Sequence, residues 1–320
     1  MTKSIDLSVD VTEAAGLGEP LATAVTVTLP DPRDLAADAS PMVCFGFPGG
    51  GYSRQYFTFD MPGASGGGQA GWHAARGWVF VSCDHLFVGE SSSPTEPDKL
   101  SFEVVAAANA ATVDGVLARL ADGAVHDAFP SLRNPISIGI GQSMGGCFTI
   151  VQQARHSSYA GVGILGFSGL QTALAFPPGT EPPTNPFEIR ADGLPAATWV
   201  FHYDDEPADV VAQDMTGYPL RERPPVWGSA TVPPCAAQML DKARVADEAA
   251  SITVPVFVGV GERDVCPDPR AEPTAYSGSR DITVFVCPRM SHMHNFASTR
   301  EQFWSRLHAW GETVARSTES

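Results

Sequence analysis

Short apolar runs recur along the chain, and most of them are followed by a glycine-rich turn and then by a stretch with helical spacing. Such runs are typical of strands buried on both faces. Their alternation with helices predicts an α/β fold with a mostly parallel central sheet and helices on both faces. The predicted strands are Thr23–Leu29, Met42–Phe47, Trp78–Cys83, Ile136–Ile140, Val162–Phe167, Val254–Val260 and Ile282–Val286, and the predicted helices are Phe102–Ala121, Gly145–Arg155 and Ala297–Arg316.

The segment from Leu170 to Pro234 breaks this alternation. It holds 12 of the 27 prolines and is rich in aromatic residues. We expect an insertion that covers part of the molecule, because plain surface loops of this length are uncommon in compact domains. The predicted organisation is a core formed by residues 1–169 and 235–320, with a cap at residues 170–234. Within the cap, Asp204-Asp205-Glu206 is expected to be a solvated acidic face.

Composition and charge indicate which classes of binding partner to expect. The 320 residues carry 36 acidic and 20 basic side chains, a formal net charge of −16 that is spread along the chain. Such a surface repels phosphate backbones and anionic headgroups, and the longest apolar runs have only strand length. We therefore expect neither nucleic-acid binding nor a membrane span. The amino-terminal residues lack a signal-peptide pattern and the six cysteines are scattered, which predicts free thiols and a cytoplasmic protein.

The motif Gly141-Gln142-Ser143-Met144-Gly145-Gly146 lies where a predicted strand ends and a helix begins. A serine on so sharp a turn needs small residues two positions before and after it, because a Cβ there would clash with the backbone. Gly141 and Gly145 meet this requirement. The turn would lift the Ser143 hydroxyl above the sheet and place the Met144 N–H where it can stabilise an oxyanion. A plain glycine-rich turn is the competing interpretation, and the strand–turn–helix context favours Ser143 as a nucleophile.

A nucleophile on this kind of turn needs an acid and then a histidine further along the chain. Asp264 lies in the first turn beyond the predicted strand Val254–Val260, and it fits the position of the acid better than Glu262 or Asp268. A turn-forming aspartate, solvated or paired with Arg263, is the alternative role for Asp264.

The loop after the last predicted strand contains two histidines, His292 and His294. His292 follows the small Ser291 at the expected apex of the loop, so we predict that it is the general base. His294 leads directly into the final helix and is expected to cap or pack the start of that helix. His85 also follows a strand, but it precedes the serine and fits a packing role better.

The run Pro48-Gly49-Gly50-Gly51 follows an early predicted strand. Residues without side chains let backbone N–H groups approach a substrate oxygen, so Gly50 and Gly51 are predicted to complete an oxyanion hole with Met144. A plain turn or a phosphate loop would also use glycines. The Walker pattern is absent and no lysine lies nearby, which disfavours nucleotide binding.

Together these motifs resemble those of the α/β-hydrolase fold superfamily, in its serine esterase and lipase branch with a cap. The glycine run resembles the His-Gly-Gly-Gly oxyanion motif, with Pro48 in place of histidine. The loop from Asp84 to Ser91 resembles the Asp-x-x-Gly-x-Gly-x-Ser loop of the family, with Phe87 where the first glycine belongs. Ser143, Asp264 and His292 match the triad positions.

The resemblance implies acyl transfer to water without a metal or an organic cofactor, and the aromatic cap suggests a small hydrophobic ester or lactone as substrate. The same triad also serves carbon–carbon hydrolases of the β-diketone type, thioesterases and acyltransferases. A non-catalytic, hydrolase-like binding protein is disfavoured, because no triad residue is missing from the sequence. The natural substrate and the oligomeric state, homo-oligomer included, stay open.

Overall fold

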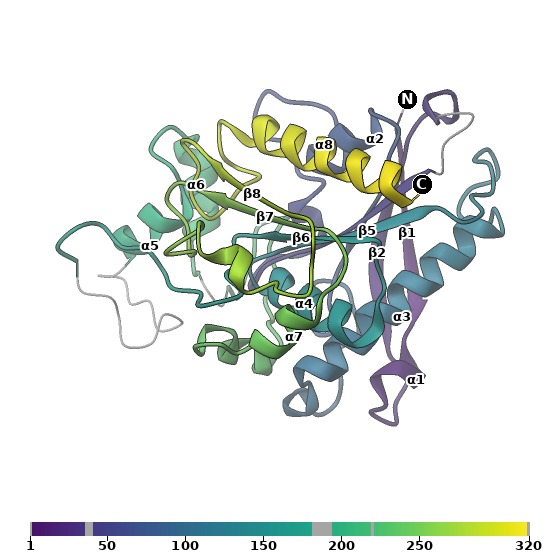
Figure 1. Ribbon diagram of the computed structural model, residues 1–320, viewed down its shortest axis with the longest axis horizontal. Coiled ribbons are helices and arrows are strands. Elements are labelled where there is room, and N and C mark those ends of the chain that lie inside the picture. The colour runs from purple at the N-terminus through teal and green to yellow at the C-terminus, as the bar shows by residue number, and fades with distance from the viewer. Residues whose placement is uncertain (1, 36–40, 181–193, 219–220, 319–320) are drawn as a thin grey trace.

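The computed structural model describes residues 2–35, 41–180, 194–218 and 221–318. These residues form an eight-stranded sheet in the order β1-β2-β4-β3-β5-β6-β7-β8 (Figure 1). The strands from β3 to β8 run parallel, and β2 is antiparallel to both of its neighbours. The strands are β1 (Lys3–Asp10), β2 (Ala22–Leu29), β3 (Met42–Phe47), β4 (Val79–Cys83), β5 (Ile136–Gln142), β6 (Gly161–Leu165), β7 (Val256–Gly261) and β8 (Ile282–Cys287).

Helices cover both faces of this sheet. Figure 1 shows α2 and α8 on one face and α3, α4 and α7 on the other. The helices are α1 (Thr12–Ala15), α2 (Gly68–Ala74), α3 (Phe102–Ala121), α4 (Met144–His156), α5 (Leu194–Phe201), α6 (Ala208–Met215), α7 (Ala246–Ser251) and α8 (Arg300–Thr318). The α/β fold class with a mostly parallel sheet is confirmed.

All seven predicted strands are present, with ends displaced by a few residues at most. The sequence interpretation missed β1, which pairs with β2 from Lys3–Leu29 to Asp10–Ala22. This strand lies at the edge of the sheet and most of its residues are exposed, so it lacks the continuous apolar run that marks the inner strands.

Helix α3 is long and apolar enough to cross a membrane by length and composition alone, but half of that stretch is buried inside the fold. Ser101 caps its start by accepting the Val104 N–H, and Val105, Val113 and Val116 are fully buried. These features are typical of a core helix in a globular protein.

The stretch between β6 and β7 contains α5, α6, a 3₁₀ helix at Pro234–Leu240 and α7. Figure 1 shows α5 and α6 together at one end of the molecule, beside the ends of β7 and β8. The 3₁₀ helix begins at the predicted end of the cap. The boundaries at residues 170 and 234 stay a prediction, and residues 181–193 of this stretch lie outside the described part of the chain.

The expectation of a solvated acidic face holds for Asp204 and Asp205, which are exposed, but is wrong for Glu206. Both aspartates pair with arginines from the loops that follow β7 and β8. Glu206 is buried, and its Oε2 lies 2.6 Å from Nδ1 of His202. The arginine partners are distant in sequence, so the local acidic run gave no sign of them.

Candidate active site

The turn that carries Ser143 connects β5 to α4 and has the geometry that the sequence predicts. Ser143 has φ 53° and ψ −116°, a conformation that costs energy for any residue with a side chain. A Cβ on Gly141 would lie 2.1 Å from the Gly145 carbonyl oxygen, and one on Gly145 would lie 2.2 Å from that of Phe47. The two glycines are therefore required by the packing of the backbone around the serine.

Asp264 and His292 come from the loops after β7 and β8, which are neighbours in the sheet. Nδ1 of His292 lies 2.7 Å from Oδ1 of Asp264. A carboxylate can only accept hydrogen bonds, so the imidazole carries its proton on Nδ1 and leaves Nε2 as a free base. Of the two competing histidines, His292 is the one that lines a cavity together with Ser143.

His294 also contacts the acid, which the sequence did not suggest. Its Nε2 lies 2.7 Å from Oδ2 of Asp264. The Asp264 carboxylate also accepts the backbone N–H groups of Gly261 at 2.8 Å and Val265 at 2.7 Å, so it receives four hydrogen bonds. Burial alone would raise the pKa of Asp264, but His292 and His294 hold it well below its usual range.

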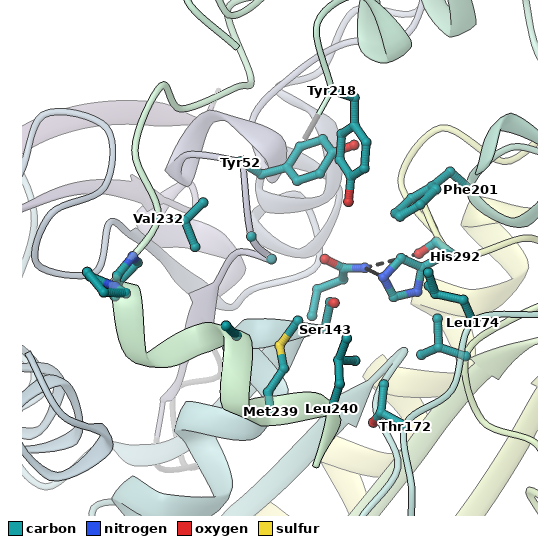
Figure 2. A pocket seen from close by; sticks show the side chains of 17 residues that line it. Tyr52, Ser143, Thr172, Leu174, Phe201, Tyr218, Val232, Met239, Leu240 and His292 are labelled. Carbon is teal, nitrogen blue, oxygen red and sulfur yellow. Dashed lines mark hydrogen bonds between the residues drawn. The ribbon is translucent and has the colours of Figure 1, made fainter. Parts of the chain in front are cut away.

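The cavity beside Ser143 has a volume of about 300 Å³. Figure 2 shows Ser143 and His292 facing it, with Tyr52, Tyr218 and Phe201 on one side and Met239 and Leu240 on the other. Within the described part of the chain, none of its lining residues is Asp, Glu, Lys or Arg. An apolar wall without charges accommodates a neutral, hydrophobic group.

The predicted oxyanion donors lie around this cavity in different ways. Gly50 lines the cavity, and Met144 begins α4 directly after the serine. Within the described residues, the N–H groups of Gly50 and Met144 donate to no backbone acceptor. The carbonyl oxygen of Gly51 accepts hydrogen bonds from Arg221 and from the Ser229 N–H. These two bonds fix the Gly51 peptide on the side of α6.

Gln142, the residue before the serine, contacts the histidine and was not singled out from the sequence. Its side-chain nitrogen donates to the His292 carbonyl at 3.0 Å and lies 3.5 Å from Nε2 of the same residue. Its Oε1 is buried without a partner among the described atoms and packs against Gly49, where a Cβ would lie 2.3 Å away. Gln142 thus bridges the histidine loop and the glycine run.

The loop that begins at Asp84 packs against the glycine run. Asp84 pairs with the buried Arg54 at 2.7 Å. Phe87 has φ 67° and Gly89 has φ 57°, so Phe87 adopts the left-handed conformation that suits the glycine it replaces. His85 is buried between Asn109 and the Pro48 carbonyl, and burial lowers its pKa to about 4, which fits the predicted packing role.

The last turn of α5 contacts the histidine loop through backbone groups. The carbonyl oxygens of Val200 and Phe201 accept the N–H groups of His292 at 3.0 Å and Met293 at 2.9 Å. Carbonyls at a helix end have no partner within the helix, so these bonds satisfy α5 and fix the histidine loop together.

Comparison with solved structures identifies the architecture. A thermophilic esterase from Thermogutta terrifontis aligns with a TM-score of 0.64 over 97% of this chain and 99% of its own, at 14% sequence identity. A proline iminopeptidase from Mycobacterium smegmatis aligns with a TM-score of 0.62 over 98% and 100%, at 16% identity. A peroxisomal α/β-hydrolase from Saccharomyces cerevisiae aligns with a TM-score of 0.58 over 98% and 88%, at 12% identity. The chain has the α/β-hydrolase fold.

At these identities the likeness establishes the α/β-hydrolase fold and leaves the reaction to be argued from the site. The sequence matches no protein-family model and no curated protein. In the α/β-hydrolase fold the carboxyl ends of the parallel strands present the loops at one edge of the sheet, and Ser143, Asp264 and His292 follow three such strands here. No group of three or more metal-ligating side chains occurs among the residues described.

Proposed function

We propose that the protein is a serine hydrolase that cleaves a neutral, hydrophobic carboxylic ester or lactone through an acyl-enzyme. The observation that carries the proposal is the serine on a strained elbow that shares an apolar cavity with a histidine, itself hydrogen-bonded to a buried aspartate. Many α/β-hydrolase relatives use this set of groups for acyl transfer, and the neighbouring esterase makes an ester the first substrate to test.

In the proposed mechanism, Nε2 of His292 takes the proton from the Ser143 hydroxyl as its Oγ attacks the carbonyl carbon. Asp264 holds the Nδ1–H tautomer and stabilises the imidazolium that forms. The N–H groups of Met144 and Gly50 receive the oxyanion, and Gly51 stays a predicted third donor. His292 then gives the proton to the leaving alcohol, and a water molecule attacks the acyl-enzyme by the same route to release the acid.

The cavity supports the substrate class. A charged acyl or alcohol group would lose its hydration against apolar walls without an ionic partner, which costs several kcal/mol. The net charge of −16 adds a general repulsion of anions. Neutral substrates with a short apolar chain fit both constraints.

Ser143→Ala is the direct test of the mechanism. With p-nitrophenyl esters of increasing acyl length, the substitution should lower kcat on the order of 10⁶-fold without affecting the fold. Labelling with a fluorophosphonate, followed by peptide mass mapping, should place the adduct on Ser143. Ser137→Ala, a change in β5 outside the cavity, is the matched control and should behave like the unmodified protein.

An active Ser143→Ala variant, or an adduct on another residue, would refute the proposal. A second panel, with thioesters and β-diketones beside oxygen esters, separates the related reactions. A preference for the β-diketone would assign the site to carbon–carbon bond hydrolysis by the same residues.

A further inference from the structure

A cluster of buried charged side chains lies behind the glycine run, outside the cavity. Its centre is Asp214 near the end of α6, which is fully buried. The Asp214 carboxylate accepts the Tyr52 hydroxyl at 2.6 Å and the Trp227 indole N–H at 2.7 Å. Nε2 of His202 lies 2.9 Å from it, and the Arg221 guanidinium 3.1 Å. Three of these partners come from the stretch between β6 and β7, and Tyr52 joins the carboxylate to the glycine run.

Arg221 extends the cluster to the backbone of the glycine run. Its Nη1 donates to the carbonyl oxygen of Gly51 at 2.6 Å, while its Nη2 and Nε donate to the carbonyl oxygen of Asp214 at 2.6 and 3.0 Å. The arginine is 1% exposed, so these bonds form away from water. The Ser229 N–H is a second donor to the Gly51 oxygen, at 2.8 Å.

The peptide between Gly51 and Tyr52 is thus held at two points. Its carbonyl is bound by Arg221, and the tyrosine that follows is bound through its hydroxyl by Asp214. Tyr52 also forms an isolated antiparallel bridge with Gly228. Gly51 has φ 81°, a conformation that a glycine leaves easily unless other contacts fix it.

The cost of the cluster argues that it does more than fill space. Burying charges is expensive, and apolar side chains of similar volume commonly give equal or greater stability. Here Arg221 bonds to Gly51, the neighbour of Gly50, which lines the cavity. Arg221 does not line the cavity, so it acts on the site through the glycine run.

We propose that Arg221 and Asp214 are positioning residues that hold the Gly50–Tyr52 loop in the conformation that accepts an oxyanion. The inference rests on the proposed serine-hydrolase function. It adds a role for the stretch between β6 and β7 beyond covering the cavity, because α6 and the segment after it supply the two groups that hold the loop.

Tyr52→Phe is the primary test, with Tyr159→Phe as its matched control. Both changes remove one hydroxyl from a buried tyrosine with a side-chain hydrogen-bond partner. Tyr159 bonds to Gln152 at 2.9 Å in the core, away from the cavity. We expect Tyr52→Phe to lower kcat by roughly 10- to 100-fold, less than the full loss of an oxyanion donor, with KM changed by less than about twofold.

Arg221→Lys is the second variant. Lysine keeps the positive charge beside Asp214 but lacks the fork that reaches Gly51 and Asp214 together, so kcat should fall in a similar range. The inhibition constant of an alkyl boronic acid supplies an independent readout. Its tetrahedral serine adduct places an oxygen in the oxyanion site, so weaker inhibition in step with the fall of kcat is expected.

The outcomes separate the two proposals, with Ser143→Ala as the reference. An active Ser143→Ala variant overturns the hydrolase function and this inference together. If Ser143→Ala is inactive while Tyr52→Phe matches Tyr159→Phe in kcat and in boronate inhibition, positioning is refuted and the hydrolase function stands. A rise in KM alone also refutes positioning. If Arg221→Lys does not fold, Tyr52→Phe decides.

Discussion

The buried cluster should stabilise the fold by an amount that depends on pH, because His202 gains and loses a proton. This dependence can be measured as a change in the free energy of unfolding. Nδ1 of His202 faces Glu206 at 2.6 Å and Nε2 faces Asp214 at 2.9 Å, while its ring stacks on Phe296. Arg221 shares the Asp214 carboxylate. Burial alone would lower the pKa of His202, but the hydrogen bonds to Asp214 and Glu206 outweigh it and raise the pKa to about 9.

The magnitude follows from the two pKa values. In the unfolded chain the histidine loses its proton near its ordinary pKa of 6.5, whereas the folded protein retains that proton up to about 9. The stabilisation is therefore fully present below about 6.5 and is lost as the pH rises through about 9. At about 1.4 kcal/mol for each of the roughly 2.5 pH units between these values, the full loss is about 3.5 kcal/mol of unfolding free energy, most of it between about pH 6 and pH 10.

Urea unfolding of the unmodified protein and of His202→Gln, followed by tryptophan fluorescence between about pH 6 and pH 10, isolates this contribution. The difference in unfolding free energy between the two proteins should be about 3 kcal/mol larger at the acid end than at the alkaline end. The comparison between proteins removes the titration of groups that His202 does not contact. A difference that stays constant with pH, or grows as the pH rises, would show that His202 is not held in its charged form.

Four further results are expected. Asp264→Asn should lower kcat roughly 10⁴-fold, because an amide nitrogen must face one of the two histidine donors and favours the wrong tautomer; an unchanged steady-state rate would contradict this. His292→Ala should abolish single-turnover acylation, whereas His294→Ala removes one of four bonds to the acid and should cost about tenfold or less; the reverse order would exchange their roles. Gly145→Ala should prevent folding or activity, since its Cβ would lie 2.2 Å from a carbonyl oxygen, while Gly146→Ala, with a nearest approach of 3.0 Å, should retain a measurable thermal transition. Each methylene added to the acyl chain should raise kcat/KM by about fourfold at most until the cavity is full, and a hemisuccinate ester that reacts as fast as the butyrate would contradict a neutral cavity.

Much of the fold could be predicted because the inner strands are buried on both faces. All six residues of β3 and all six of β7 are buried, so each strand appears in the sequence as a continuous apolar run. Strand β1 is exposed along most of its length, and its alternating pattern is short and interrupted by charges. The physical signal that marks a core strand is therefore absent from this edge.

The candidate site likewise has a part that the sequence predicts and a part that it does not. Ser143 could be located because a strained turn needs glycines at fixed spacing, which is a local requirement. The contact of His294 with Asp264 and the burial of Glu206 depend on loops from different strands. The cluster around Asp214 joins residues 52 and 221, which are separated by more than half of the chain. Such long-range polar pairings leave no periodic pattern in a sequence.

The contact between α5 and the histidine loop has a consequence for the order in which the molecule is assembled during synthesis. The carbonyls of Val200 and Phe201 have no partner until residues 292 and 293 have been synthesised, about 90 residues later. At typical rates of elongation this delay is roughly 5 to 20 s. Tyr52, by contrast, has already emerged when α6 is made. The nascent chain can therefore close its glycine-run side early. The end of α5 keeps exposed acceptors that a chaperone or a protease can reach until the histidine loop after β8 is in place.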